Sequence, residues 1–330
     1  MKGKIKLTAF LSFIILVLVF NCASASKQGN IGNGEKNTVS VVMEGDSWLD
    51  YPFAKDLHDT IKEKYFKTEI DNKQYIVDYN VVSAGHAGDE LLKMVIEFEF
   101  IKLVNKKIPD LFLLSGGGND LLNKAVLSSI IKTNTNICEQ KDKTHIDCFV
   151  NQKKLERRIE IIIAGIKIIA NELQDIFEEN KAKFEQDSTK LSIPREFKTI
   201  PLFVHGYDYI NVKKEQENCP FLQRIFFRCQ WLYPVVKDFD PEIQRKIAKH
   251  LIDEFNKALK KLSEDQAFKD KVFYIDLRET LGNEIWSDEI HPSTKGFQAL
   301  SNKINANVIE TLHKKWEFNI KTSSQKTGKK

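Results

Sequence analysis

The sequence predicts an α/β protein with a largely parallel sheet that helices cover on both faces. Five short runs are almost continuously apolar and rich in β-branched and aromatic residues, which is typical of buried parallel strands. Segments with helical spacing of apolar residues lie between these runs, and this alternation favours a covered parallel sheet. Polar motifs follow four of the five runs, at the carboxyl ends of strands, where loops of α/β sheets build ligand sites.

The predicted elements follow one another in a regular order. The strands are expected at residues 38–44, 74–83, 109–115, 199–205 and 271–277. The helices are expected at residues 53–66, 88–106, 152–185, 241–263 and 293–314. Two stretches, 121–158 and 207–240, are longer than ordinary connections, and we interpret both as insertions over one edge of the sheet.

The composition is that of an ordinary globular protein. The chain has 330 residues, of which 42% are hydrophobic and 29% charged, and these values exclude a disordered or collagen-like chain. The length suits one large domain with insertions better than several small domains. We therefore expect one domain over residues 26–320, followed by a polar tail at 321–330.

The N-terminal segment has the pattern of a secretory signal peptide. Three lysines precede an apolar stretch at 7–20, and Ala23-Ser24-Ala25 supplies small residues for cleavage. The apolar stretch is shorter than the ~20 residues that a membrane-spanning helix needs, and no later apolar run is longer. We expect removal of residues 1–25 and export to the periplasm or medium, with lipidation of Cys22 as the alternative.

The charge balance argues against a nucleic-acid partner. Loss of residues 1–25 removes three lysines and no acidic residue, so the net charge falls from +4 to +1. Nucleic-acid binding depends on a basic surface that neutralises phosphates, and this balance does not supply one. The sequence does not specify an oligomeric state.

The cysteines of the mature chain form two close pairs. Cys138 and Cys148 are separated by nine residues, as are Cys219 and Cys229, and each pair lies in one of the two insertions. In an exported protein this pattern favours two local disulfides, Cys138–Cys148 and Cys219–Cys229. A metal site is the rival interpretation, but the spacing is not that of zinc ligands.

Four short motifs carry the candidate chemistry. They are Gly45-Asp46-Ser47, the segment 83–89, Gly116-Gly117-Gly118-Asn119-Asp120 and Asp288-Glu289-Ile290-His291-Pro292. A serine hydroxyl becomes a nucleophile when a base removes its proton, and His291 is a suitable base for Ser47. Asp288, three residues before His291, can hold the imidazole and stabilise its charged form. Backbone N–H groups of Ser47 and Gly85 and the Asn119 amide can bind an oxyanion.

The chain resembles the SGNH (GDSL-type) hydrolases, and the resemblance covers nearly all of the mature sequence. Gly45-Asp46-Ser47 resembles the nucleophile block, Gly85 the block-two glycine, and Gly117 to Asp120 the G-x-N-D block. Asp288-x-x-His291 resembles the final block, which supplies the acid and the base. The resemblance implies the same roles for Ser47, His291, Asp288, Gly85 and Asn119. It also implies a flavodoxin-like three-layer α/β/α sandwich with a five-stranded parallel sheet.

Three further residues are candidate substrate contacts. His86 lies beside the Gly85 donor, and His205 and Tyr207 follow the fourth predicted strand at its carboxyl end. A solvated loop histidine is an equal interpretation for His86. The aromatic residues of 207–240 can form an acyl-binding wall or simply the core of an insertion.

These observations together predict an exported serine esterase. The expected substrates are carboxylic esters, lipid acyl esters first and acetylated carbohydrate or cell-wall glycans as the alternative. The mechanism needs no metal or organic cofactor. A non-catalytic binding protein on the same fold and an acyltransferase are the competing interpretations.

Overall fold

The computed structural model describes most of the chain after its N-terminal segment. The described residues are 37–63, 65–70, 73–132, 144–186, 199–212, 230–282 and 285–316. All of them belong to one compact unit, Glu35–Ser323. The predicted signal segment 1–25 and the tail 321–330 lie outside the described residues.

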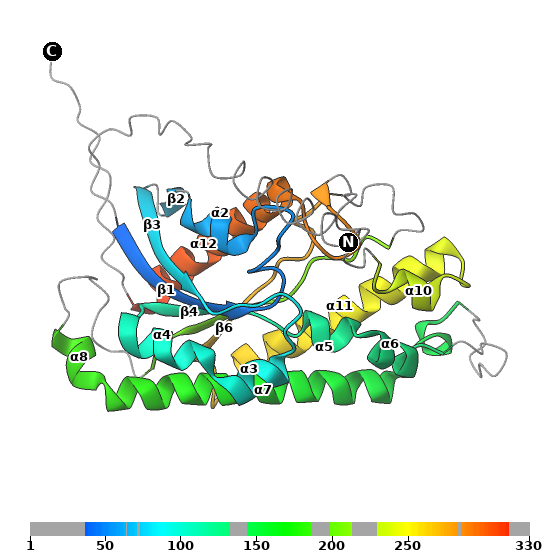
Figure 1. Cartoon of the computed structure of the whole chain (residues 1–330), viewed down its shortest axis with the longest axis horizontal. Helices are drawn as coiled ribbons and strands as arrows, with labels where there is room; N and C mark the ends of the chain where they lie inside the picture. The colour runs from blue at the N-terminus through cyan, green and yellow to red at the C-terminus, as the bar shows by residue number, and fades with distance from the viewer. Residues whose placement is uncertain are drawn as a thin grey trace, which may run out of the picture. The chain divides into compact units, whose positions relative to one another are not determined.

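A single six-stranded sheet forms the centre of the described part of the chain (Figure 1). Its strands are β1 (Asn37–Gly45), β2 (Phe66–Ile70), β3 (Lys73–Ser83), β4 (Leu111–Ser115), β5 (Leu202–His205) and β6 (Val272–Ile275). The spatial order is β2-β3-β1-β4-β5-β6, and every pairing is parallel except that between β2 and β3. The five parallel strands follow the order of flavodoxin-like sheets.

The mixed α/β class with a largely parallel sheet is therefore confirmed, whereas the predicted count of five strands is wrong. The additional strand, β2, extends the β3 edge as an antiparallel partner, with Phe66 opposite Val77. Its Phe66 ring also packs edge-on against Tyr79. The predicted helix at 53–66 is shorter than expected, because α2 (Leu57–Lys62) begins only after Asp56, whose side chain accepts the Asp59 N–H as an N-cap.

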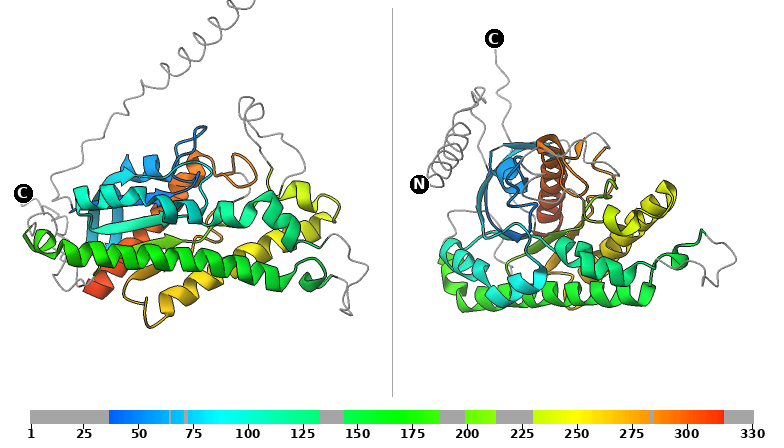
Figure 2. Two further views of the ribbon diagram at one scale, coloured as in Figure 1. Left: turned by 60° about the horizontal axis from the view of Figure 1, so that its bottom comes forward. Right: turned by 45° about the vertical axis from the view of Figure 1, so that its right-hand side comes forward.

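Helices cover both faces of the sheet. α2 and α12 (Thr294–Trp316) lie on one face, and the sheet curves around α12 (Figure 2). The other face carries α3 (Leu91–Glu97), α4 (Glu99–Lys107), α7 (Gln152–Glu179) and α11 (Pro241–Glu264) (Figure 1). The single helix predicted at 88–106 is divided into α3 and α4 at Phe98, which has a φ of 47°. The shorter helices are α5 (Gly118–Leu122), α6 (Lys124–Ile130), η2 (Ile146–Cys148), α8 (Lys181–Gln186) and α10 (Tyr233–Val236).

The two predicted insertions are described in part. α6 and η2 belong to the first and α10 to the second, and α10 packs against α6. Cys148 is buried. Cys138, Cys219 and Cys229 lie outside the described residues, so the two predicted pairs stay predictions. Among the helices that the structure describes, none combines the length and apolarity needed to cross a bilayer.

Candidate active site

The Gly45-Asp46-Ser47 segment turns sharply as it leaves β1. The Asp46 N–H donates to the Ser115 carbonyl at the end of β4 (2.9 Å), and the Leu49 N–H donates back to the Asp46 carbonyl (2.9 Å). The Asp46 carboxylate also accepts the Trp48 N–H at 3.1 Å. These bonds fix the turn at the carboxyl edge of the sheet, and Ser47 keeps a partly exposed side chain there.

Ser47, His291 and Asp288 form a continuous chain of hydrogen bonds. Ser47 Oγ lies 2.7 Å from His291 Nε2, and His291 Nδ1 lies 2.7 Å from Asp288 Oδ2. An ionised carboxylate can only accept, so Nδ1 carries the proton and Nε2 accepts from the serine hydroxyl. This is the arrangement in which an imidazole can remove the serine proton.

The Asp288 carboxylate is ionised and firmly held. The backbone N–H groups of Ile290 and His291 donate to its Oδ1 at 2.9 and 2.7 Å, and the Tyr51 hydroxyl donates to Oδ2 at 3.2 Å. Burial alone would raise the pKa of Asp288, but the interaction with the His291 imidazole and these backbone bonds together lower it. The Tyr51 ring also stacks on the His291 ring, with the ring centres 4.3 Å apart. Position and charge of the acid are thus set before a substrate binds.

A tyrosine bridges the nucleophile turn and the loop after β4. The Tyr207 hydroxyl donates to Asp46 Oδ2 at 2.5 Å and accepts the Gly118 N–H at 3.1 Å. Burial raises the pKa of Asp46 to about 6, although the bonds from Tyr207 and Trp48 oppose the rise. Tyr207 was expected as a substrate contact. Its ring lines the pocket described below, while its hydroxyl joins two loops of the protein.

The groups expected to bind an oxyanion lie in the predicted loops. Two of them, the Gly85 N–H and the Asn119 amide, already donate hydrogen bonds within the protein. The Gly85 N–H donates to Ser83 Oγ at 3.0 Å, and Asn119 Nδ2 donates to the Asp89 carbonyl at 3.0 Å. A glycine is required at position 85, because a Cβ there would lie 2.9 Å from the Leu49 Cβ. Asn119 Nδ2 has a second hydrogen that can point to a bound ester.

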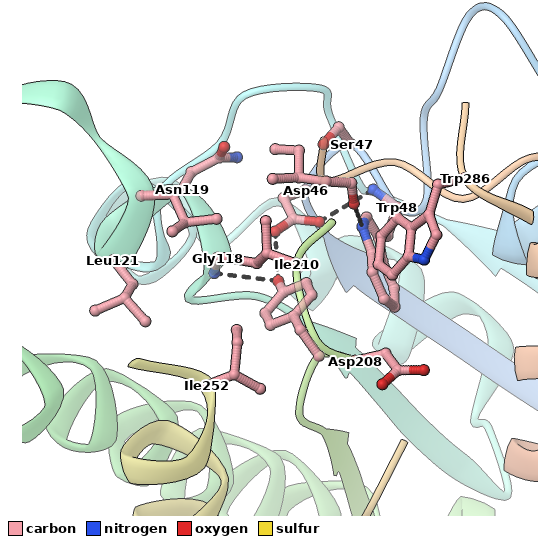
Figure 3. A pocket seen from close by; sticks show the side chains of 13 residues that line it. Asp46, Ser47, Trp48, Gly118, Asn119, Leu121, Asp208, Ile210, Ile252 and Trp286 are labelled. Atoms are coloured by element: carbon pink, nitrogen blue, oxygen red, sulfur yellow. Dashed lines mark hydrogen bonds between the residues drawn. The ribbon is translucent and has the colours of Figure 1, made fainter. Parts of the chain in front are cut away.

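A mainly apolar pocket opens beside the nucleophile. Ser47, Asn119 and Asp46 lie in the upper part of the view in Figure 3, and Gly118 lies below them. Its apolar lining consists of Leu121, Leu122, Ile210, Ile252, Trp286 and Ile290, with Tyr207 and Trp48 beside them. The lining is therefore mainly apolar, with the polar groups of Ser47 and Asn119 at its edge.

The two histidines predicted as substrate contacts lie elsewhere. His205 has 0% exposure and stacks beneath Trp48, with its Nδ1 bonded to the Gly206 carbonyl at 2.8 Å. Burial lowers the pKa of His205 to about 4, so the ring is neutral. His86 is half-exposed, and its Nε2 lies 3.0 Å from Glu99 Oε2. It is not among the residues that line the pocket.

The sequence did not indicate the contacts that three residues of the site make. Glu289, between the two triad members, is fully buried, and its carboxylate accepts backbone N–H groups of the segment 231–233. Burial raises the pKa of Glu289 to about 7, against the opposing effect of these bonds. Tyr51 and Trp231 both contact the His291 ring. Their partners are distant in sequence, so no local pattern could indicate these contacts.

One cluster among the described residues has the geometry of metal ligands. Candidate oxygen and nitrogen atoms of Asp56, His58 and Asp59 lie within 4.8 Å of one another. Asp56 already accepts the Asp59 N–H and the Tyr51 N–H, as expected of a helix N-cap. The cluster is therefore explained by the start of α2.

Comparisons with known proteins find similar solved structures only. No family model and no curated protein sequence matches the chain. A lipase from a goat rumen metagenome is similar at 15% identity and a TM-score of 0.46, over 82% of this chain and 97% of that one. A Clostridium thermocellum family 3 carbohydrate esterase is similar at 13% identity and a TM-score of 0.40, over 84% of this chain and 98% of that one. An extracellular lipase from Streptomyces rimosus is similar at 13% identity and a TM-score of 0.41, over 82% of this chain and 99% of that one. Because these identities and TM-scores are low, the functional assignment rests on this chain's own residues.

Proposed function

We propose that the chain is a serine ester hydrolase of the SGNH type that acts on carboxylic esters, with lipid acyl esters as the favoured class. The observation that carries the proposal is the unbroken chain from Ser47 Oγ through His291 to the ionised Asp288, with both bonds at 2.7 Å. Such a chain is the machinery of acyl transfer through a covalent intermediate.

The reaction follows from these positions. Ser47 Oγ attacks the ester carbonyl while His291 Nε2 takes its proton, and Asp288 stabilises the resulting imidazolium. The oxyanion then binds to the N–H of Ser47, to Asn119 and to Gly85. His291 returns the proton to the leaving alcohol, and an acyl-enzyme remains. Water that His291 activates in the same way releases the acid and restores the hydroxyl of Ser47.

The substrate class follows from the pocket beside Ser47. Its lining by leucine, isoleucine and tryptophan side chains supports an apolar acyl group as the part of the ester that binds there. Acetylated carbohydrate or cell-wall glycan is the alternative, and an acceptor other than water would make the chain an acyltransferase.

The first test is hydrolysis of p-nitrophenyl esters from acetyl to palmitoyl, with Ser47→Ala beside the unaltered chain. We expect turnover to rise beyond acetyl, and to fall about 10⁴-fold or more in Ser47→Ala. Ser129→Ala is the matched control, since Ser129 is exposed on α6 and bonds only to the Val126 carbonyl in the described contacts. Undiminished turnover in Ser47→Ala would contradict the mechanism.

Other outcomes separate the remaining alternatives. Turnover of the acetyl ester alone would favour a carbohydrate or cell-wall O-acetylesterase. Product that depends on an added alcohol acceptor would indicate acyl transfer. No turnover, and no labelling of Ser47 by a fluorophosphonate, would favour a binding protein.

Export and two disulfides belong to the same proposal. Support comes from the N-terminal pattern of residues 1–25 and from the cysteine spacing. The intact mass of the chain recovered from its native cells tests both features. We expect a mass without residues 1–25 and four hydrogens lighter than the fully reduced chain, whereas a lipid attached to Cys22 would support the lipoprotein alternative.

A further inference from the structure

Glu289 holds two segments of the second insertion to the triad loop, one through its carboxylate and the other through its backbone carbonyl. It accepts three successive backbone N–H groups, from Trp231, from Leu232 at 2.9 Å and from Tyr233 at 2.8 Å. The backbone carbonyl of the same residue accepts the Asn211 N–H at 3.1 Å. Residue 289 therefore holds this insertion from two sides, one residue away from Asp288.

The chemistry of these bonds requires a carboxylate. Three N–H donors need three acceptor sites, and a carboxylate offers about four on its two oxygens. A glutamine at the same place would turn its amide N–H₂ toward one or more of the donors. Glu289 is fully buried, so water does not replace a lost partner there.

The segment that Glu289 holds brings Trp231 against the catalytic base. The Trp231 and His291 rings pack edge-to-face, with centres 5.1 Å apart and planes at 76°. Trp231 is only partly buried, and it is not among the residues that line the apolar pocket beside Ser47. Trp231 therefore keeps some exposed surface while its ring contacts His291.

The direction of proton transfer indicates which part of an ester lies there. His291 Nε2 gives its proton to the leaving oxygen, so the alcohol part of the substrate departs next to the imidazole. In the proposed reaction the acyl part occupies the apolar pocket beside Ser47, whose lining does not include Trp231. An aromatic ring beside the imidazole is therefore placed to contact the alcohol part.

We infer that Glu289 is a positioning residue that holds Trp231 beside His291, and that Trp231 selects esters by their alcohol part. The leaving-group role rests on the proposed ester hydrolysis, whereas the holding role does not. An apolar or flat alcohol gains contact with the indole ring, and a small aliphatic alcohol does not reach it. The acyl preference is set separately by the pocket.

The experiment compares two esters of the same acid, ethyl and 2-naphthyl, in the full chain and three variants. For Trp231→Ala we expect kcat/KM to fall about 2- to 10-fold more with the naphthyl ester than with the ethyl ester, the size of one aromatic contact. Glu289→Gln should show the same pattern. The double variant should lose no more than Trp231→Ala, because Glu289 acts through Trp231.

Amide hydrogen exchange tests the holding role without any catalysis. Glu289→Gln should speed exchange in peptides that cover residues 230–236. Asp110→Asn is the matched control, because Asp110 also accepts a backbone N–H, that of Ser40 at 2.6 Å, at the opposite end of the sheet. It should leave both the exchange of 230–236 and the ratio of the two esters unchanged.

Three results would overturn the inference. They are equal losses on both esters, additive losses in the double variant, and unchanged exchange in Glu289→Gln. A melting curve shows whether Glu289→Gln folds, and if it does not, Trp231→Ala alone decides the leaving-group role. A chain that hydrolyses neither ester defeats the proposed function together with the leaving-group role, while amide exchange still decides whether Glu289 holds the segment.

Discussion

The two sides of Ser47 differ in where their hydrogen bonds already go. On the β6 side, Ser47, His291 and Asp288 are joined in one chain of bonds, and Asp288 accepts two further backbone N–H groups. This half of the site needs no rearrangement to transfer a proton. Preassembly of this kind lowers the cost of reorganisation when charge develops.

On the β3 and β4 side, donors are present but occupied. The Gly85 N–H bonds to Ser83 Oγ, and one Asn119 hydrogen bonds to the Asp89 carbonyl. An oxyanion must therefore compete with the protein for Gly85, whereas Asn119 still has a hydrogen to offer. The comparison teaches that the acid–base half is fixed by folding, while the donor half is completed by the substrate.

The largest expected effect concerns the preassembled side. Asp288→Asn should lower kcat about 10⁴-fold, because the amide oxygen would keep the N–H bonds of Ile290 and His291 and turn Nδ2 toward His291 Nδ1. That contact forces the wrong tautomer on the imidazole. The measurement is kcat on the best p-nitrophenyl ester, with a melting curve to verify folding. A loss below 10-fold would mean that the acid is dispensable.

The next effect concerns the free hydrogen on the donor side. Asn119→Ala should lower kcat by about 10²–10³-fold with little change in KM, since the amide binds charge that exists only in the transition state. Leu122→Ala is a useful comparison, because Leu122 lines the same pocket without a polar group and should raise KM for long acyl chains instead. Equal changes of KM in both variants would show that Asn119 only shapes the pocket.

The same contrast explains what the sequence could predict. The five parallel strands were predictable, because short apolar runs alternated with helical patterns. Ser47, Asp288 and His291 were also predictable as neighbours, because each lies in a loop at the carboxyl edge of one sheet. β2 was not, since a five-residue edge strand has too short an alternation and gains its order from pairing with β3.

Side-chain partners were less predictable than positions. His205 ends β5 and Tyr207 lies two residues later, so the two looked equivalent in the sequence. The His205 ring nevertheless stacks on Trp48, while the Tyr207 hydroxyl donates to Asp46. The occupation of the Gly85 N–H depends on a rotamer of Ser83, which no motif encodes. The residue types around Glu289 indicate only a buried turn. The N–H groups that its carboxylate accepts belong to residues 231–233, which are distant in sequence.

A pH effect on stability sharpens the comparison, because a buried carboxyl lies at the end of β1 near the donor side. Burial raises the pKa of Glu44 to about 8, with the charges of Asp89 and Glu99 adding to the rise and the Gly45 N–H opposing it. The folded chain thus favours the protonated form. The contribution of protonated Glu44 to the stability of the fold is fully present below pH 4.5, the ordinary pKa of a glutamate. It is lost as pH rises through about 8, the pKa in the folded chain.

Glu44→Gln should remove this dependence. The amide stays neutral and its oxygen can accept the Gly45 N–H, so the variant should melt above the unaltered chain by an amount that grows from pH 5 to pH 9. Thermal melting at both pH values measures the difference. A difference in melting temperature that is constant with pH, or that decreases as pH rises, would show that Glu44 is already ionised in the folded chain.

The smallest expected effect tests the comparison most directly, at the occupied donor. Ser83→Ala removes the hydroxyl that takes the Gly85 N–H, and it leaves the backbone donor free for the oxyanion. A neutral hydrogen bond is worth about 0.5–1.5 kcal/mol net, so we expect kcat to rise about 2- to 10-fold with KM unchanged. A fall in kcat of similar size would show the opposite, that the serine hydroxyl holds the Gly85 N–H in its productive direction. The donor half would then be preassembled as well, and the contrast between the two sides of Ser47 would disappear.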